Sequence, residues 1–136
     1  MMRTYSLCVP GLPPKKSGSE SMWRNPREAT RILALRRAAR DAIQGQGPLT
    51  TDITLVLKMH LTHNNRWLGD LDTFIAGVCD GLQPMAGNTV PAAALAGEDC
   101  REAIGFLDDA FVIRIEAEKC ISAGEQDSYE VEIRGE

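Results

Sequence analysis

Four aspartates stand in two pairs, one on each side of a predicted helix. Asp70 and Asp72 open the helix, and Asp108 and Asp109 come after it, just before the next predicted strand. Carboxylates that share a small volume repel each other unless a divalent cation lies between them. Mg²⁺ binds carboxylates together with water and phosphate oxygens, and it activates water for hydrolysis of a phosphodiester. We therefore expect the four acids to meet in one site for Mg²⁺, with Mn²⁺ as an alternative ion.

Each pair also has a purely structural interpretation. Aspartate is favoured at the cap and first turn of a helix, where it meets free backbone amides. Two aspartates are equally at home in a turn before a strand. Asp80, eight residues after Asp72, is interpreted as a solvated helix acid or as an indirect partner of the ion. The metal site is the favoured hypothesis because both pairs flank the same helix.

The hydrophobic pattern predicts the elements that must position these acids. Alternating apolar and β-branched residues predict strands at 3–9, 52–62, 111–118 and 129–134. Apolar residues at helical spacing predict one helix that begins at Asn25-Pro26 and a second over 71–82. The order is β-α-β-α-β-β. It predicts an α+β fold with a single mixed sheet and helices packed on it, in one domain over 1–136.

Two further expectations concern the second half of the chain. The last two strands are separated by a short turn, so they are expected to pair as an antiparallel hairpin. Residues 83–103 contain several prolines and glycines and are expected to be irregular, with room for a short helix at 92–104.

The charges are divided unevenly along the chain. Residues 1–66 hold 11 Lys/Arg and 4 Asp/Glu, whereas residues 67–136 hold 4 Lys/Arg and 15 Asp/Glu. A basic half beside an acidic half is typical of a protein that binds a polyanion with one surface and a metal with another. The alternative is an ordinary mixed surface whose charges are separated only in the sequence. The net charge of −4 counts against strong nonspecific DNA binding.

Several classes of protein are disfavoured by the sequence. No apolar run is long enough to span a bilayer, and no secretory signal is visible, so a cytoplasmic location without membrane partners is expected. The cysteines form no CxxC, which argues against a zinc site or a disulfide framework. The glycines form neither GxGxxG nor a P-loop, so no nucleotide cofactor is expected.

Two segments carry a resemblance to a known family. The first is Gly-Asp-Leu-Asp-Thr-Phe-Ile-Ala-Gly-Val-Cys-Asp-Gly-Leu at 69–82, and the second is Ile-Gly-Phe-Leu-Asp-Asp-Ala-Phe-Val at 104–112. Together with Tyr-Ser-Leu-Cys-Val-Pro-Gly-Leu-Pro-Pro at 5–14, they resemble the RusA family of Holliday junction resolvases. The order of elements agrees with that family over most of the chain.

The resemblance implies a small homodimeric endonuclease of phage or prophage origin that cuts four-way DNA junctions with Mg²⁺ in recombination and repair. It implies that Asp70, Asp72 and Asp109 are the catalytic, metal-binding acids and that Asp108 is an auxiliary metal ligand. A twofold dimer suits this task, because a four-way junction has approximate twofold symmetry and needs two symmetric cuts.

Three positions depart from the family pattern. Thr73 replaces the usual asparagine, Ala76 replaces the usual lysine, and residues 83–103 form a longer connection. A lysine at position 76 would stabilise charge on the scissile phosphate, which alanine cannot do. Arg66 or Lys58 could substitute for it in space. The alternative function is therefore a weakened relative that binds branched DNA without efficient cleavage, and a more distant one is a structural protein whose acids are caps and surface groups.

Candidate DNA contacts are the basic residues of the first half, because arginine and lysine bind phosphate. They are Lys15, Lys16, Arg27, Arg31 and Arg66. The arginines of the first helix, which also include Arg36, Arg37 and Arg40, are expected to cover the surface left free by its apolar stripe. A solvated helix face is the alternative interpretation.

Two tryptophans and two histidines are further candidates for contacts with DNA or metal. Trp23 and Trp67 are candidates for stacking on unpaired bases, although tryptophans are more often buried. His60 and His63 form an H-x-x-H, and on a strand this odd spacing sends two side chains to opposite faces, which disfavours joint metal binding.

Overall fold

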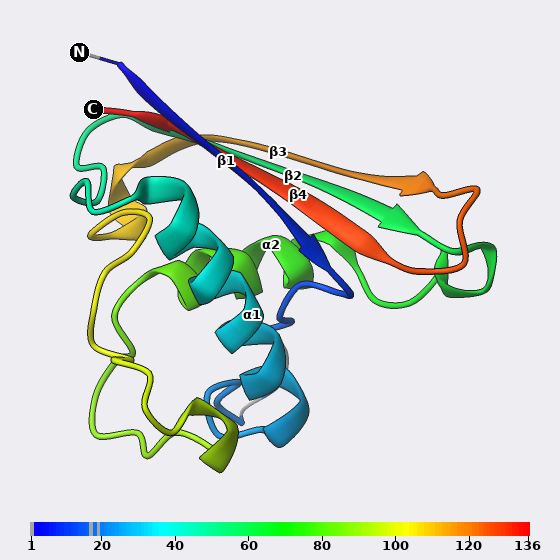
Figure 1. The fold of residues 1–136 in the computed structure, drawn as a ribbon, viewed down its shortest axis with the longest axis horizontal. Helices are drawn as coiled ribbons and strands as arrows, with labels where there is room; N and C mark the ends of the chain where they lie inside the picture. Colours follow the sequence, from blue (N-terminus) through cyan, green and yellow to red (C-terminus); the bar gives the residue numbers. More distant parts are fainter. Residues whose placement is uncertain (1, 17, 19) are drawn as a thin grey trace.

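A mixed sheet of four strands carries two helices on one face (Figure 1). The computed structural model describes residues 2–16, 18 and 20–136. The elements are β1 (Arg3–Pro10), α1 (Pro26–Ile43), β2 (Ile53–Leu61), α2 (Leu71–Leu82), β3 (Val112–Ile121) and β4 (Ser128–Gly135). Short 3₁₀ turns occur at His63–Asn65, Ala93–Leu95 and Asp109–Phe111. This is the predicted α+β fold with the predicted element order. No helix in the described part of the chain is long and apolar enough to cross a bilayer.

The strand order is β1-β4-β2-β3, so the expected hairpin between the last two strands is wrong. β3 pairs with β2 in parallel, and β4 lies antiparallel between β1 and β2. The burial of the side chains explains why β4, and not β3, lies in the centre of the sheet. Tyr129, Val131 and Ile133 of β4 are at most 1% exposed, whereas Ile115 of β3 is 50% exposed. The strand whose apolar side chains all lie on the buried face therefore occupies the centre of the sheet, and β3 lies at its edge.

The helices form where the sequence supplies both a cap and an apolar stripe. The Asn25 side chain accepts hydrogen bonds from the N–H groups of Arg27 and Glu28, at 3.0 and 3.2 Å. Such a cap stabilises a helix by about 1 kcal/mol. The apolar stripe of α1 includes Ile32 and Leu35, which are fully buried. In β2 every second residue from Ile53 to Leu61 is buried, because that face of the strand lies under the helices.

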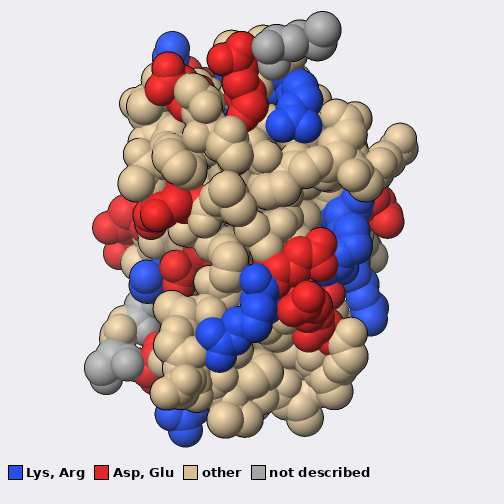
Figure 2. Space-filling view, turned by 90° about the vertical axis from the view of Figure 1, so that its left-hand side faces the viewer, with Lys and Arg blue, Asp and Glu red and all other residues tan. Residues whose placement is uncertain are grey.

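The basic and acidic halves of the sequence meet in space. Arg40 contacts Glu98 at 2.8 Å and Glu102 at 3.5 Å, and Lys58 contacts Glu118 at 3.6 Å. On the face drawn in Figure 2, Lys and Arg side chains lie directly beside Asp and Glu side chains. The ion pairs therefore support the interpretation of a mixed surface over that of two separate charged surfaces.

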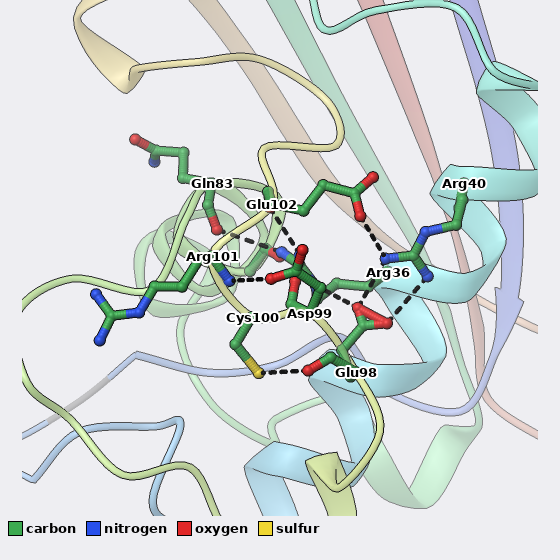
Figure 3. A network of polar contacts seen from close by, with 9 residues as sticks. Arg36, Arg40, Gln83, Glu98, Asp99, Cys100, Arg101 and Glu102 are labelled. Carbon is green, nitrogen blue, oxygen red and sulfur yellow. Dashed lines mark hydrogen bonds and ion pairs between the residues drawn. The ribbon is translucent and has the colours of Figure 1, made fainter.

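Arg36 departs most from its expected place. It was expected on the surface of the first helix, yet its side chain is completely buried. It reaches into the 83–103 segment, where its Nε donates to Glu98 at 3.0 Å (Figure 3). Its other nitrogens donate to the backbone carbonyls of Gly81, Gln83, Asp99 and Glu102. One guanidinium thereby satisfies the carbonyls of a segment that has almost no regular structure.

Glu98 completes this network. Burial alone would raise the pKa of its carboxyl, but hydrogen bonds from Arg40 and Arg36 outweigh burial and hold the pKa below its usual range. The carboxylate is thus charged in the folded protein and neutralises the buried guanidinium of Arg36. The network fixes the 83–103 segment to α1 and so determines where the chain returns toward α2.

Candidate functional site

The two pairs of predicted acids lie toward opposite ends of α2. Asp70 is the N-cap of the helix and Asp72 lies in its first turn. Asp109 lies near the other end, where its N–H donates to Oε1 of Gln83 at 3.0 Å. A helix of this length is about 18 Å long. Among the described residues, no three His, Cys, Asp or Glu side chains are grouped so that they could hold a metal ion. The expected convergence of all four carboxylates is therefore not found.

All four acids are exposed, and the side chains of Asp72 and Asp108 have local backbone partners. Asp72 accepts the N–H of Thr73 at 3.0 Å, and Asp108 accepts the N–H of Ala110 at 2.9 Å. The side chain of Asp70 makes no capping hydrogen bond, and its carbonyl oxygen accepts the Thr73 hydroxyl at 2.8 Å. Capping accounts for Asp108, and the position of Asp70 at the start of the helix is electrostatically favourable by itself.

Asp109 and Asp80 instead share a pocket between α2 and β3. The pocket has a volume of about 270 Å³. Its lining is Lys16, Ile75, Ala76, Cys79, Asp80, Asp109, Val112 and Ile115. The Nζ of Lys16 lies 3.4 Å from Oδ2 of Asp80. Two carboxylates, one ammonium group and an apolar wall are thus brought together from three separate parts of the chain.

A close contact between α2 and the loop after β1 brings Lys16 to this pocket. A Cβ at Gly77 would lie 2.0 Å from the carbonyl oxygen of Pro14, so only glycine permits the approach. The N–H of Lys16 then donates to the Thr73 carbonyl at 3.1 Å. From this point the Lys16 side chain extends along α2 to Asp80. Its ammonium group enters the same pocket as Ala76, where the family resemblance would place a lysine.

The two residues expected to compensate for Ala76 lie elsewhere. Lys58 points away from the helices, on the opposite face of the sheet, and pairs with Glu118. Arg66 donates to the His63 carbonyl at 2.6 Å and lies 5.5 Å from the Trp67 ring centre. The sequence alone did not reveal the position of Lys16, because a lysine in a loop can reach many places.

The buried thiol of Cys79 reports on the charge in the pocket. Burial, followed by the negative charges of Asp109 and Asp80, raises the pKa of Cys79 to about 12. The thiol is therefore protonated at neutral pH in the free protein, so the negative charge of the pocket lies on the carboxylates. The two carboxylates remain as the donors of this pocket.

The donors fit Mg²⁺ better than they fit zinc. Mg²⁺ is commonly held by one or two carboxylates, with water and substrate phosphates completing its shell. Zinc sites use Cys and His ligands in larger number. Asp80 and Asp109 line a pocket that is open to solvent, so water and a phosphate can enter beside them. Asp72 lies on the same side of α2, two turns before Asp80.

The basic residues expected to contact DNA fall into two places. Lys15, Arg27 and Arg31 surround Glu28, a buried acid at the start of α1. Glu28 accepts the N–H of Lys15 at 2.9 Å and pairs with Arg31 at 3.2 Å and Arg27 at 3.4 Å. This places them beside the loop that carries Lys16. Arg66 lies apart from them, next to the start of α2.

The two candidate tryptophans differ in exposure, and the two candidate histidines lie in different elements. Trp23 is only 4% exposed and lies under the guanidinium of Arg36, so it is a core residue. Trp67 is 81% exposed. His60 bonds to Glu130 at 2.6 Å on the sheet, and His63 lies in a separate 3₁₀ turn.

Compared with known proteins, the chain matches no family model and no curated protein sequence.

Proposed function

We propose that the protein is a Mg²⁺-dependent DNA endonuclease that acts on branched DNA, with four-way junctions as its substrate. One observation carries the proposal: Asp80, Asp109 and the ammonium group of Lys16 share one open pocket. The resemblance of 69–82 and 104–112 to the RusA family supports it independently, because these are the two segments that supply the carboxylates of the pocket.

Within this proposal the two carboxylates have a common role. Asp80 and Asp109 would hold Mg²⁺, which when bound would supply an activated water and stabilise the charge of the leaving oxygen. Asp72 extends the row of negative charge along α2 and orients water at the mouth of the pocket. Asp70 and Asp108 are exposed and contribute less. This ranking differs from the family pattern, in which Asp70, Asp72 and Asp109 are the main acids.

Lys16 acts on the phosphate. In the free protein its ammonium group partly neutralises Asp80. When a phosphodiester enters, the same group donates to a phosphate oxygen and stabilises the charge that develops there. Lys15, Arg27 and Arg31 lie beside the loop that carries Lys16, so they continue the path of the DNA backbone toward α1. Arg66 contacts the backbone on the other side, near the start of α2.

A cleavage assay with a labelled synthetic four-way junction tests the proposal. With Mg²⁺ or Mn²⁺, the protein is expected to introduce paired, symmetric nicks. Asp109→Asn removes one ligand charge and is expected to lower the cleavage rate by about 100-fold or more. Asp108→Asn is the matched control, since the neighbouring carboxylate only accepts a local N–H, and its rate should stay within a few-fold of the parent.

Two outcomes would overturn the proposal. One is intact junction DNA after incubation with the parent protein and either ion. The other is equal loss of activity in the Asp108→Asn and Asp109→Asn variants, which would show that the pocket does not single out Asp109. A rise in melting temperature with Mg²⁺ that Asp80→Asn abolishes would establish ion binding without reference to activity.

A second candidate function is binding of branched DNA without efficient cleavage. It is favoured by the fact that Lys16 is already engaged with Asp80 while Ala76 offers no charge. A gel shift with the junction distinguishes the two functions. Tight binding without nicks, together with a gain of cleavage in Ala76→Lys, would support the second function over the first.

A further inference from the structure

The backbone N–H groups of Lys15 and Lys16, in the loop after β1, bind two different helices. The two residues before them are buried prolines, which have no N–H, so Lys15 and Lys16 supply the next backbone donors of the loop. The N–H of Lys16 donates to the Thr73 carbonyl of α2 at 3.1 Å. The N–H of Lys15 donates to Oε1 of Glu28, on α1, at 2.9 Å. The loop is therefore fixed from both sides at the point where the Lys16 side chain leaves it.

The acceptor on α1 is a buried carboxylate whose two oxygens have different main partners. Glu28 is 4% exposed. Its Oε1 accepts the N–H of Lys15, whereas its Oε2 pairs with Arg31 at 3.2 Å and with Arg27 at 3.4 Å. An acid in the first turn of a helix is favoured by the helix dipole alone. The dipole does not account for the burial of this acid, nor for its hydrogen bond to a loop residue thirteen positions earlier.

We propose that Glu28 is a positioning residue, which keeps the ammonium group of Lys16 in the pocket between α2 and β3 by holding the N–H of Lys15. The Nζ of Lys16 lies 3.4 Å from Oδ2 of Asp80, but the Lys16 side chain is 57% exposed, so packing does little to fix it. A lysine side chain in solvent has many rotamers, and its backbone anchor decides which places its ammonium group can reach. The chemical use of this position rests on the proposed nuclease function, whereas the position itself does not.

The same carboxylate connects two groups of proposed phosphate contacts. Oε1 holds the loop that carries Lys16, and Oε2 holds Arg27 and Arg31. Substitutions separate these two roles. In Glu28→Gln the amide oxygen can still accept the N–H of the loop, while the NH₂ group cannot pair with the arginines, which turn to solvent. Glu28→Leu removes both acceptors and keeps a side chain of similar volume.

Zero-length crosslinking with a carbodiimide tests the position of Lys16 without reference to activity. The reagent joins an ammonium group to a carboxylate that it contacts, and mass spectrometry of the digested protein measures each yield. The pair Lys16–Asp80 should crosslink in the parent protein. Glu28→Leu should lower this yield by about tenfold, as loss of a hydrogen bond to a charged group predicts, and Glu28→Gln should keep most of it. The pair Lys58–Glu118, at 3.6 Å on the other face of the sheet, is the internal reference and should not change.

Two further variants make the test independent of a single substitution. Lys15→Pro removes the donor instead of the acceptor and should lower the Lys16–Asp80 yield as Glu28→Leu does. Gly77→Ala displaces the loop from the side of α2 and shows how large the loss is when the loop has moved. An unchanged yield in Glu28→Leu and Lys15→Pro would overturn the proposal. Equal losses in Glu28→Gln and Glu28→Leu would also overturn it, because the acceptor for the loop would then not be what holds Lys16.

Junction cleavage provides a second readout, which depends on the nuclease proposal. Glu28→Leu should slow cleavage about as much as it lowers the crosslink yield. Adding Ala76→Lys supplies an ammonium group to the pocket from α2 itself, so it should recover the rate without restoring the Lys16–Asp80 crosslink. A general structural defect would not be corrected in this way. A parent protein that cuts no junction would remove the nuclease proposal, and the crosslink yields would still decide the role of Glu28.

Discussion

The two ends of α2 both carry aspartates, yet they differ in what surrounds them. At the N-terminal end Asp70 and Asp72 are exposed and have only local backbone partners. At the C-terminal end Asp80 and Asp109 face a pocket that also receives Lys16 from a distant loop. The difference teaches that acids on a helix come to share a pocket only where another part of the chain returns to them. The returning segment, 83–109, is held in place by Arg36.

The largest effect is expected from a substitution that removes the side chain holding the returning segment near the C-terminal end of α2. Arg36→Met leaves four backbone carbonyls and Glu98 without their buried donor. Removing one partner from a buried charge pair costs about 3–5 kcal/mol. The free energy of unfolding, measured by urea denaturation, should fall by that amount.

Arg37→Met is the control for this experiment. The neighbouring arginine is exposed on the same helix, so its replacement should change the free energy of unfolding by less than about 0.5 kcal/mol. Equal effects of the two variants would show that the buried network does not support the 83–103 segment.

The second experiment separates the loop from the helix. In Gly77→Ala the new Cβ would meet the Pro14 carbonyl at 2.0 Å, so the loop that carries Lys16 must move away from α2. Such overpacking costs about 1–3 kcal/mol, which thermal unfolding will detect. Gly47→Ala has open space around the new methyl group and should leave the melting temperature nearly unchanged. If Gly77→Ala were as stable as the parent, the contact between position 77 and the Pro14 carbonyl would not be tight.

The third experiment tests what the positive charge of Lys16 contributes to the pocket at the C-terminal end of α2. If the ammonium of Lys16 serves the pocket, Lys16→Ala should lower junction cleavage by about 10- to 100-fold, as loss of one charged donor does. Ala76→Lys in the same chain should recover most of the rate, because position 76 lines the same pocket. Lys15→Ala should mainly weaken DNA binding. A double variant as slow as Lys16→Ala would contradict the proposed equivalence of positions 16 and 76.

The smallest expected effect concerns Cys79. Its pKa of about 12 in the folded protein lies above the value near 8.5 expected in an unfolded chain. As pH rises past 8.5 the unfolded chain loses this proton first, so the folded state is destabilised progressively, by up to about 1.4 kcal/mol per pH unit. Urea denaturation between pH 8 and 10 should show a smaller loss in Cys79→Ala than in the parent. If the free energy of unfolding depended on pH identically in the parent and in Cys79→Ala, the thiol of Cys79 would not be shielded from solvent.

Much of the fold could be predicted because its signals are local. The stripe from Leu71 to Leu82 and the Asn25 cap define the two helices without reference to the rest of the chain. The position of β4 could not be predicted in the same way. A short turn favours a hairpin with the preceding strand, and only the burial of Tyr129 and Val131 shows that β4 belongs in the centre.

The site was predicted in part. The sequence singled out Asp109, which the structure places in the pocket, and α2, which lines it. The convergence of Asp70 and Asp72 with Asp109 failed because the length of a helix separates its two ends. For Asp80 the sequence leaves open a solvated acid or an indirect partner of the ion, and the structure places it in the pocket, on the same side of α2 as Ala76 and Asp72. The sequence does not indicate that Arg36 is buried, because nothing in the sequence distinguishes it from the exposed arginines beside it.

The central position of β4 has a consequence for how the protein is made. β1 and β2 have no contact as strands until β4 lies between them, and β4 ends at Gly135. A ribosome delivers residues in order, so β1 cannot join the sheet before residues 128–135 have been synthesised. Until then the edges of β1 and β2 that face β4 are unpaired, and the pairing of β1 with β4 spans more than one hundred residues, which favours slow folding. Chaperones that bind nascent chains can therefore act on β1 throughout the synthesis of the residues that separate it from β4.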